Sequence, residues 1–272
     1  MLDLNALPTK WAAHRYQRST VPTLIAVHSA ETQELAQSAE NTASYLAGGS
    51  TVVSVHYVVD ADSIVRTARH SERTNGAGGG WNECAIHIEQ AGRAAQSAAE
   101  WLDPYSRATV KRCAQVIAAV HRELPQIPVG RRLGVGEIVA AVRAGRNPCG
   151  VAAHVDLTEA AKILGRSTAG HWDPGPGYPW PVLFADVAAE LGGNPNPAPH
   201  PTPNPQEADM PELVQVKGDP TVYAVGSDLE VRALTHPAQR DIVLRLWPSA
   251  AITVVSAGEL AALKALSARP TV

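Results

Sequence analysis

The apolar residues of this chain follow two periods in turn. Runs of consecutive or alternating apolar residues, which are typical of strands, occur at 23–29, 51–68, 84–92 and 150–158. The second of these contains two runs around a turn at 60–63. Apolar residues that recur every three or four positions, which is typical of helices, occur at 31–49, 103–124 and 182–193. Strands that alternate with helices predict an α/β fold, with a mixed central sheet flanked by helices.

The first predicted helix, 31–49, shows the helical period clearly. One face carries Leu35, Ala39, Thr42 and Leu46, and the pair of glycines at 48–49 provides the stop. We therefore expect this segment to cover the sheet with that face.

Six prolines at alternate positions from Pro195 to Pro205 interrupt this pattern. Each proline fixes its own backbone and favours extended geometry in the residue before it, so the segment predicts a semi-rigid spacer. A long surface loop is the alternative. We divide the chain into a first domain at 1–193, a proline-rich linker at 194–209 and a small module at 210–272.

The pattern of the tail predicts a separate α+β module. Short strands are expected at 212–216, 221–226, 230–234 and 251–255. A helix is expected at 236–246, and Ser256 with Glu259 forms a capping box that opens a final helix. A module of this size can fold alone, with little stability to spare.

Composition and charge exclude several classes of protein. A net charge of -3 gives no electrostatic reason to expect nucleic acid or an anionic membrane as a partner. No run approaches the ~20 apolar residues of a membrane-spanning helix, and the N-terminus lacks the pattern of a secretory signal. Three scattered cysteines are too few for a disulfide framework. We expect synthesis in a reducing compartment.

Two histidines stand at the ends of apolar strands, His28 in IAVHSAE and His154 in VAAHVDLT. With Asp173, in the Pro- and Gly-rich loop HWDPGPGYPW, they offer two imidazoles and one carboxylate, the donor set of a catalytic zinc site with an open fourth position. The same donors suit ferrous iron. The alternative is that both histidines are hydrogen-bonded core residues. Cys149 is a rival ligand or a buried thiol.

Glu89 lies on the strand predicted at 84–92, where alternation places it on one face with His87 and places Ile86 and Ile88 on the other. A carboxylate there can orient or deprotonate an attacking water. The alternative is an exposed strand residue in a surface ion pair.

Four segments in this order resemble the zinc-dependent N-acetylmuramoyl-L-alanine amidases of type 2: IAVHSAET, VSVHYVVDADSIVRTA, NECAIHIEQAG, and VAAHVDLT followed by HWDPGPGYPW. That family includes phage endolysins, cytosolic amidases that recycle muropeptides, and the animal peptidoglycan recognition proteins. The resemblance covers residues from about 20 to 192. The DPGPG motif and WLDPYS at 101–106 are most similar to endolysins of phages that infect mycobacteria and their relatives.

The resemblance implies a role for each matching position. His28, His154 and Asp173 match the ligands of the family's zinc ion (Zn²⁺), and Glu89 matches the acidic residue that positions the attacking water. His171 stands where many members have a lysine that stabilises the oxyanion. His70 is expected to bind substrate, because it lies where the family's strand pair leads into the substrate groove. Val55 departs from one branch of the family, which has a tyrosine there, so Glu89 is expected to act alone.

We also expect Trp172, Tyr178 and Trp180 to pack around the loop that carries Asp173, although one of them could line the peptide groove. The prolines and glycines leave this loop few conformations, so it can hold Asp173 at the metal and His171 at the substrate carbonyl.

The implied reaction is hydrolysis of the peptidoglycan amide between N-acetylmuramic acid and the L-Ala of the stem peptide. The spacer and the extra module favour a phage endolysin, a monomer whose C-terminal module binds the cell wall. It would be made in the host cytoplasm without a signal peptide and reach the wall through holin pores. The alternatives are a cytosolic muropeptide-recycling amidase and a peptidoglycan-binding protein without catalysis. Dimerisation or stabilisation is the alternative role for the module.

Overall fold

The computed structural model describes residues 2–168 and 170–192, and beyond them four strands of the tail. The chain forms two compact units, residues 1–198 and 199–272. The predicted linker at 194–209 lies outside the described residues, so the predicted domain boundaries stay predictions.

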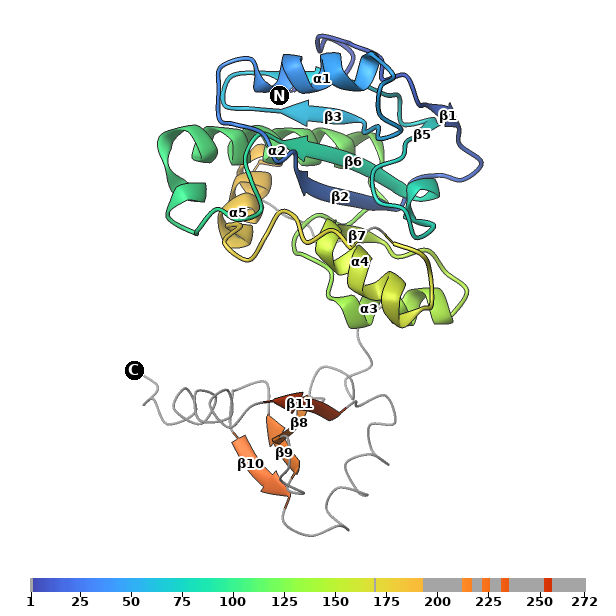
Figure 1. The fold of residues 1–272 in the computed structure, drawn as a ribbon, viewed down its shortest axis with the longest axis vertical. Coiled ribbons are helices and arrows are strands. Elements are labelled where there is room, and N and C mark those ends of the chain that lie inside the picture. Colours follow the sequence, from blue (N-terminus) through green and yellow to red (C-terminus); the bar gives the residue numbers. More distant parts are fainter. Residues whose placement is uncertain are drawn as a thin grey trace. The chain divides into compact units, whose positions relative to one another are not determined.

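A five-stranded sheet forms the centre of the first unit (Figure 1). Its strands, in spatial order, are β4 (Ile64–Arg66), β3 (Tyr57–Val59), β6 (Ala85–Gln90), β2 (Leu24–Ser29) and β7 (Gly150–Ala153). β3, β6, β2 and β7 run parallel, and β4 pairs antiparallel with β3 through the predicted hairpin. A two-stranded ribbon joins β1 (Tyr16–Gln17) to β5 (Glu72–Arg73). The predicted mixed sheet is confirmed.

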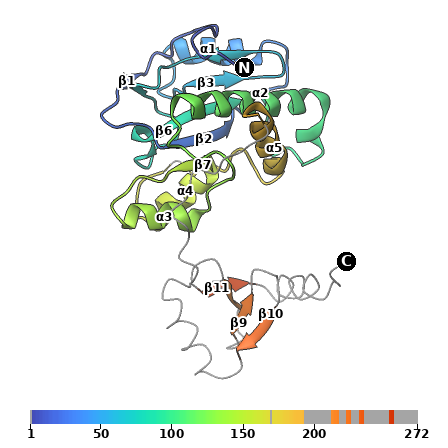
Figure 2. The ribbon, with the colours of Figure 1, turned by 180° about the vertical axis from the view of Figure 1, so that it is seen from behind.

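Helices cover both faces of this sheet (Figure 2). One face is covered by α2 (Pro104–Glu123) and α5 (Trp180–Glu190), which also pack against each other. The other face is covered by α1 (Ser38–Ala47), α3 (Val135–Arg143) and α4 (His154–Ile163). Two 3₁₀ turns, η1 (Trp81–Glu83) and η2 (Glu100–Leu102), precede β6 and α2. α2 begins where Asp103 accepts a hydrogen bond from the Ser106 N–H, with Pro104 at the first helical position.

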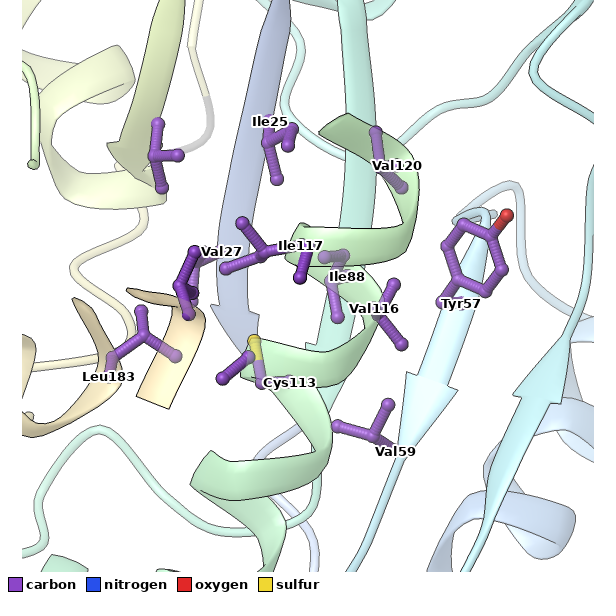
Figure 3. Packing of buried hydrophobic residues seen from close by; sticks show 14 of the residues in the cluster. Ile25, Val27, Tyr57, Val59, Ile88, Cys113, Val116, Ile117, Val120 and Leu183 are labelled. Carbon is purple, nitrogen blue, oxygen red and sulfur yellow. The ribbon is translucent and has the colours of Figure 1, made fainter. Parts of the chain in front are cut away.

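The two strands at the centre of the sheet divide their side chains between these faces. Ile25 and Val27 of β2, with Ile86 and Ile88 of β6, enter the core under α2. There they meet buried residues of α2 (Figure 3), which are Cys113, Val116, Ile117 and Val120. Because side chains alternate along a strand, the residues between them point to the opposite face. That face carries His28, His87 and Glu89.

The helix predicted at 31–49 exists only in its second half. Ser38 ends the preceding loop by donating a hydrogen bond to the carbonyl of Gln33 and accepting one from the N–H of Leu35. Gln37 has a φ of 126°, which no helix accommodates. Leu35 is consequently 56% exposed, and its predicted place on the buried face is wrong.

The strand predicted at 150–158 is also shorter than expected. β7 ends at Ala153, and His154 is the first residue of α4. The side chain of Asp156 accepts the Ala153 N–H at 3.0 Å, which caps the helix from within its first turn. His154 therefore stands at a strand-to-helix junction, which sequence periodicity did not reveal.

The described part of the second unit is a four-stranded sheet of β8 (Glu212–Val216), β9 (Val222–Val225), β10 (Val231–Leu234) and β11 (Ile252–Val255). Its order is β10-β9-β8-β11, with β11 parallel to β8 and the other pairs antiparallel. These are the four predicted strands. The predicted helices at 236–246 and from 256 onward lie outside the described residues. Within the described part of the chain, no helix is long and apolar enough to span a membrane.

Candidate active site

A cleft lies where three parallel strands of the first unit end, the usual place for ligands in open α/β sheets. Its volume is about 310 Å³. It is lined by residues that follow β2, by the segment 75–78, and by the loop after α4; the lining residues are Ser29, Ala30, Glu31, Val53, Asn75, Gly76, Ala77, Gly78, Glu89, His154, His171 and Asp173.

Three buried side chains converge beside this cleft: His28, His154 and Asp173, which are 1%, 3% and 6% exposed. The Nδ1 atoms of the two histidines lie 3.0 Å apart. Asp173 Oδ2 lies 3.2 Å from His28 Nδ1, and Asp173 Oδ1 lies 3.0 Å from His154 Nδ1. The sequence prediction named these three residues, and the structure brings them together.

The spacing of these atoms fits one small cation. In a tetrahedral site with bonds of about 2.0–2.1 Å, neighbouring ligand atoms lie about 3.3 Å apart. The three separations here are close to that value, and one potential ligand atom from each residue lies within 4.8 Å of the others. Imidazole nitrogens and carboxylate oxygens are common protein ligands of zinc. The residues present therefore fit the predicted zinc ion.

Asp173 supplies the negative charge of this cluster. Burial by itself favours the neutral acid, but hydrogen bonds from His154 and His28 outweigh burial and hold the pKa of the Asp173 carboxyl well below its usual range. The carboxylate is therefore ionised at neutral pH and available to a cation.

The loop that carries Asp173 is fixed from two sides. The Val155 N–H, in the first turn of α4, donates to the backbone carbonyl of Asp173 at 3.0 Å. Further along the loop, the Tyr178 hydroxyl donates to Gln90 Oε1 at 2.8 Å, and Gln90 Nε2 donates to the carbonyl of His28 at 3.2 Å. The loop is thereby connected to the strand that carries His28.

Gly175 lets this loop approach the neighbouring chain. A Cβ at this position would lie 1.8 Å from the carbonyl oxygen of Ala94, and its φ is +88°. Only glycine meets both conditions. The turn after Asp173 therefore depends on this residue.

Glu89 faces the same cleft from β6. It is half-buried, and its Oε2 atom is buried without a hydrogen-bond partner in the described residues. Burial, together with the negative charge of Asp173, raises the pKa of the Glu89 carboxyl to about 8. Such a carboxylate readily takes up a proton, which is the property required of a general base.

His171 lies at the edge of the cleft, where its side chain is 54% exposed. Its ring stacks on His154 with centroids 4.5 Å apart and planes at 17°. Burial and the neighbouring His154 lower the pKa of His171, so the imidazole is neutral at neutral pH. Its Nδ1 lies 3.8 Å from Asp173 Oδ1. The Nδ1 atoms of His28 and His154 lie closer to the same carboxylate, at 3.2 and 3.0 Å.

The structure places His70 elsewhere. Its Nε2 lies 2.7 Å from the Tyr57 hydroxyl and its Nδ1 lies 3.1 Å from Glu123 Oε2, so it connects β3 to α2. It does not belong to the lining of the cleft. Its predicted role in substrate binding therefore gains no support from its position.

Two other expectations need correction. Tyr178 and Trp180 pack as expected, with Tyr178 in edge contact with Trp101, but Trp172 is 52% exposed at the rim of the loop. Cys149 is exposed and donates to the carbonyl of Gln126, so it is not a buried thiol. It is also absent from the cluster of potential ligands among the described residues.

His87 is the residue that sequence reasoning passed over. It is fully buried, and its Nδ1 lies 3.0 Å from His28 Nε2. Alternation had placed it on the face of Glu89, but the pattern of one strand does not show which residue of the next strand it meets. The register of β2 and β6 supplies that information.

One protein family has a model that matches this sequence, N-acetylmuramoyl-L-alanine amidase, over residues 17–176. The match covers more than half of the chain and includes His28, Glu89 and Asp173. The chain belongs to the N-acetylmuramoyl-L-alanine amidase family. The predicted family and enzyme class are confirmed.

Several solved structures are similar to this amidase. The Staphylococcus aureus hydrolase AmiA, in complex with its ligand, has 18% identity and a TM-score of 0.48, covering 70% of this chain and 87% of its own. A selenomethionine derivative of AmpD has 19% identity and a TM-score of 0.43, covering 69% and 99%. A mutant endolysin from Bacillus subtilis has 17% identity and a TM-score of 0.43, covering 69% and 99%. No curated protein matches the sequence. The expected sequence similarity to endolysins of mycobacterial phages stays a prediction.

Proposed function

We propose that this amidase is a peptidoglycan hydrolase that acts as a phage endolysin. It cleaves the amide between the lactyl group of N-acetylmuramic acid and the L-Ala of the stem peptide. The observation that carries the reaction is the convergence of His28, His154 and Asp173 beside a cleft that also contains Glu89. Membership of the amidase family supports the choice of bond.

The proposed roles follow from the position of each side chain. His28, His154 and Asp173 hold the zinc ion. Zinc bound there would polarise the scissile carbonyl and make an attacking water more acidic. Glu89 accepts a proton from that water and can return it to the leaving amine. His171 is neutral and exposed to the cleft, and it donates an N–H hydrogen bond to the carbonyl oxygen as negative charge develops.

The products of digestion test this reaction. Purified peptidoglycan is incubated with the full chain, with and without a chelator, and the soluble products are identified by mass spectrometry. We expect stem peptides that begin at L-Ala, released only when metal is available. Products cut within the glycan or within the peptide would contradict the bond assignment. Binding to peptidoglycan without any products would instead support a non-catalytic binding protein.

The endolysin role is supported by the second compact unit and by the proline-rich segment at 194–209, because a soluble substrate requires no attachment to a wall. Under this proposal the amidase is a monomer that is released to the wall through holin pores. Turnover on intact sacculi and on soluble muropeptides separates the two roles. An endolysin is expected to prefer sacculi, whereas preference for the soluble substrate would favour a recycling amidase.

A further inference from the structure

A buried hydrogen bond connects His87 to His28, one of the three residues of the proposed metal centre. His87 lies on β6, two residues before Glu89 and on the same face of the sheet. Its Nδ1 lies 3.0 Å from His28 Nε2. Within the described residues, His28 Nε2 has this one hydrogen-bond contact. His28 therefore uses Nδ1 toward Asp173 and His154 and Nε2 toward His87.

The chemistry of imidazole fixes where the protons lie when a metal is held. A neutral imidazole carries one N–H, and a ring that binds a cation through Nδ1 must carry its proton on Nε2. His28 Nε2 then donates, so His87 Nδ1 must accept. The proton of His87 consequently sits on its Nε2, which is buried and has no hydrogen-bond partner in the described residues.

We propose that His87 is a positioning residue for the metal centre: its Nδ1 accepts the Nε2–H of His28 and holds His28 in the tautomer and orientation that direct the Nδ1 lone pair at the cation. This inference rests on the metal site of the proposed function. Partners that hold a ligating histidine in this way usually contribute substantially to metal affinity.

The backbone and the ring of His87 are both held in place. The His56 N–H donates to the carbonyl of His87, and the His87 N–H donates to His56 Nδ1, each at 3.0 Å. His56 therefore binds both backbone groups of this residue. The ring itself lies over Gly76, where a Cβ would be 2.5 Å from His87 Cγ. The acceptor atom is thus rigidly placed.

The second histidine ligand has no equivalent support. The Nε2 of His154 is buried and has no hydrogen-bond partner in the described part of the chain. Among the described residues, a hydrogen bond between the second ring nitrogen and another side chain is therefore found for His28 and not for His154. Removing it should weaken the site without removing any ligand.

Zinc affinity of the full-length protein tests the proposal without reference to catalysis. It is measured by competition with a chromophoric chelator for wild type, His87→Leu and His87→Asn. We expect His87→Leu to bind zinc about 10- to 100-fold more weakly. His87→Asn places a carboxamide oxygen near the position of Nδ1 and should recover most of that loss. His70→Leu is the control, because it removes a half-buried histidine whose ring nitrogens contact Tyr57 and Glu123, and its zinc affinity should equal that of wild type.

Imidazole ¹⁵N spectra of the zinc-loaded wild type provide a second readout that does not depend on any variant folding. We expect His28 to be protonated at Nε2 and His87 to be unprotonated at Nδ1. A proton on His87 Nδ1, or wild-type affinity in His87→Leu, would overturn the role of His87 while the metal centre stands. Failure of wild type itself to bind zinc would instead remove the metal site of the proposed function.

Discussion

His28 and Glu89 stand directly beside each other on the parallel strands β2 and β6, each one residue before its strand ends. The sheet register therefore brings a proposed metal ligand and the proposed base to the same edge and the same face. A slip of one residue in either strand would turn its side chain into the core beneath α2. The placement of both groups is thus a property of the backbone, and each can be tested separately.

Glu89→Gln should abolish most of the turnover and leave zinc in place. Glutamine has the same shape but cannot accept a proton, and general base catalysis contributes about 10²- to 10⁴-fold. Glu89 is outside the cluster of converging ligand atoms. Turnover on purified peptidoglycan and zinc content by elemental analysis are measured together. Glu159→Gln, which removes an exposed carboxylate on α4, is the control. Loss of zinc from Glu89→Gln would show that Glu89 is a ligand.

The same substitution should change how the stability of the metal-free protein depends on pH. Burial raises the folded-state pKa of Glu89 to about 8, above its usual value of 4.5. The folded state therefore binds this proton more tightly than the unfolded state, and the associated stability is present below pH 4.5 and lost as the pH rises through about 8. Glutamine does not titrate, so Glu89→Gln does not lose this stability as the pH rises.

We accordingly expect the stability of metal-free Glu89→Gln relative to wild type to rise by about 4 kcal/mol between pH 5 and pH 9. Chemical denaturation at several pH values in the presence of a chelator measures the difference. A difference that stays constant across this range would contradict the elevated pKa.

His171→Ala should lower turnover while zinc stays bound. Removal of one donor to a developing oxyanion costs about 10²- to 10³-fold, and His171 Nδ1 is 3.8 Å from the carboxylate of Asp173. Trp172→Ala, at the exposed neighbouring position of the same loop, is the control for disturbance of the loop. If zinc is lost along with activity in His171→Ala, His171 is a ligand and its assignment as a donor fails.

Residue types and their order were sufficient to predict which three side chains, those of His28, His154 and Asp173, lie together. His28 lies at the end of one apolar strand and His154 directly follows another, and parallel strands bring their carboxyl ends to one edge. Asp173 sits among prolines and glycines that can only form a loop. The strand and helix periods also predicted the sheet and, among its flanking helices, α2, α5 and part of α1, but they did not predict α3 or α4. What these signals share is that each is contained in a short stretch of sequence.

Of the features that the sequence did not reveal, two depend on contacts between distant segments and two depend on local hydrogen bonds. The role of His87 requires the register between β6 and β2, and His70 is held by Glu123, more than fifty residues away. The helix that begins at His154 depends on one cap from Asp156, which the strand-like sequence around it concealed. Leu35 was assigned by period to a helix that Ser38 interrupts through local hydrogen bonds.

Gly175→Ala should weaken zinc binding through Asp173. An added methyl group would collide with the carbonyl of Ala94, so the turn that holds Asp173 must shift. Gly170→Ala is a matched control, because Gly170 also has a positive φ, +76°, but nothing within 4 Å of the added Cβ. Both variants incur backbone strain of about 1 kcal/mol, and only Gly175→Ala incurs the collision. Zinc affinity and thermal stability are compared. Equal affinities in the two variants would show that the close approach is not needed to place Asp173.

Truncation after residue 198 tests the proposed wall-binding role of the second unit. Every buried hydrophobic residue of the described core lies between Leu4 and Val187, so the shortened protein should retain its melting temperature. Turnover on a soluble muropeptide should be unchanged, because the cleft is lined by residues 29–173. Sedimentation with intact cell walls should be lost, and turnover on sacculi should fall most at low enzyme concentration, where attachment raises the local concentration of enzyme. If the shortened protein sediments with walls as the full chain does, the second unit serves another purpose, and size-exclusion chromatography of both forms would then test dimerisation.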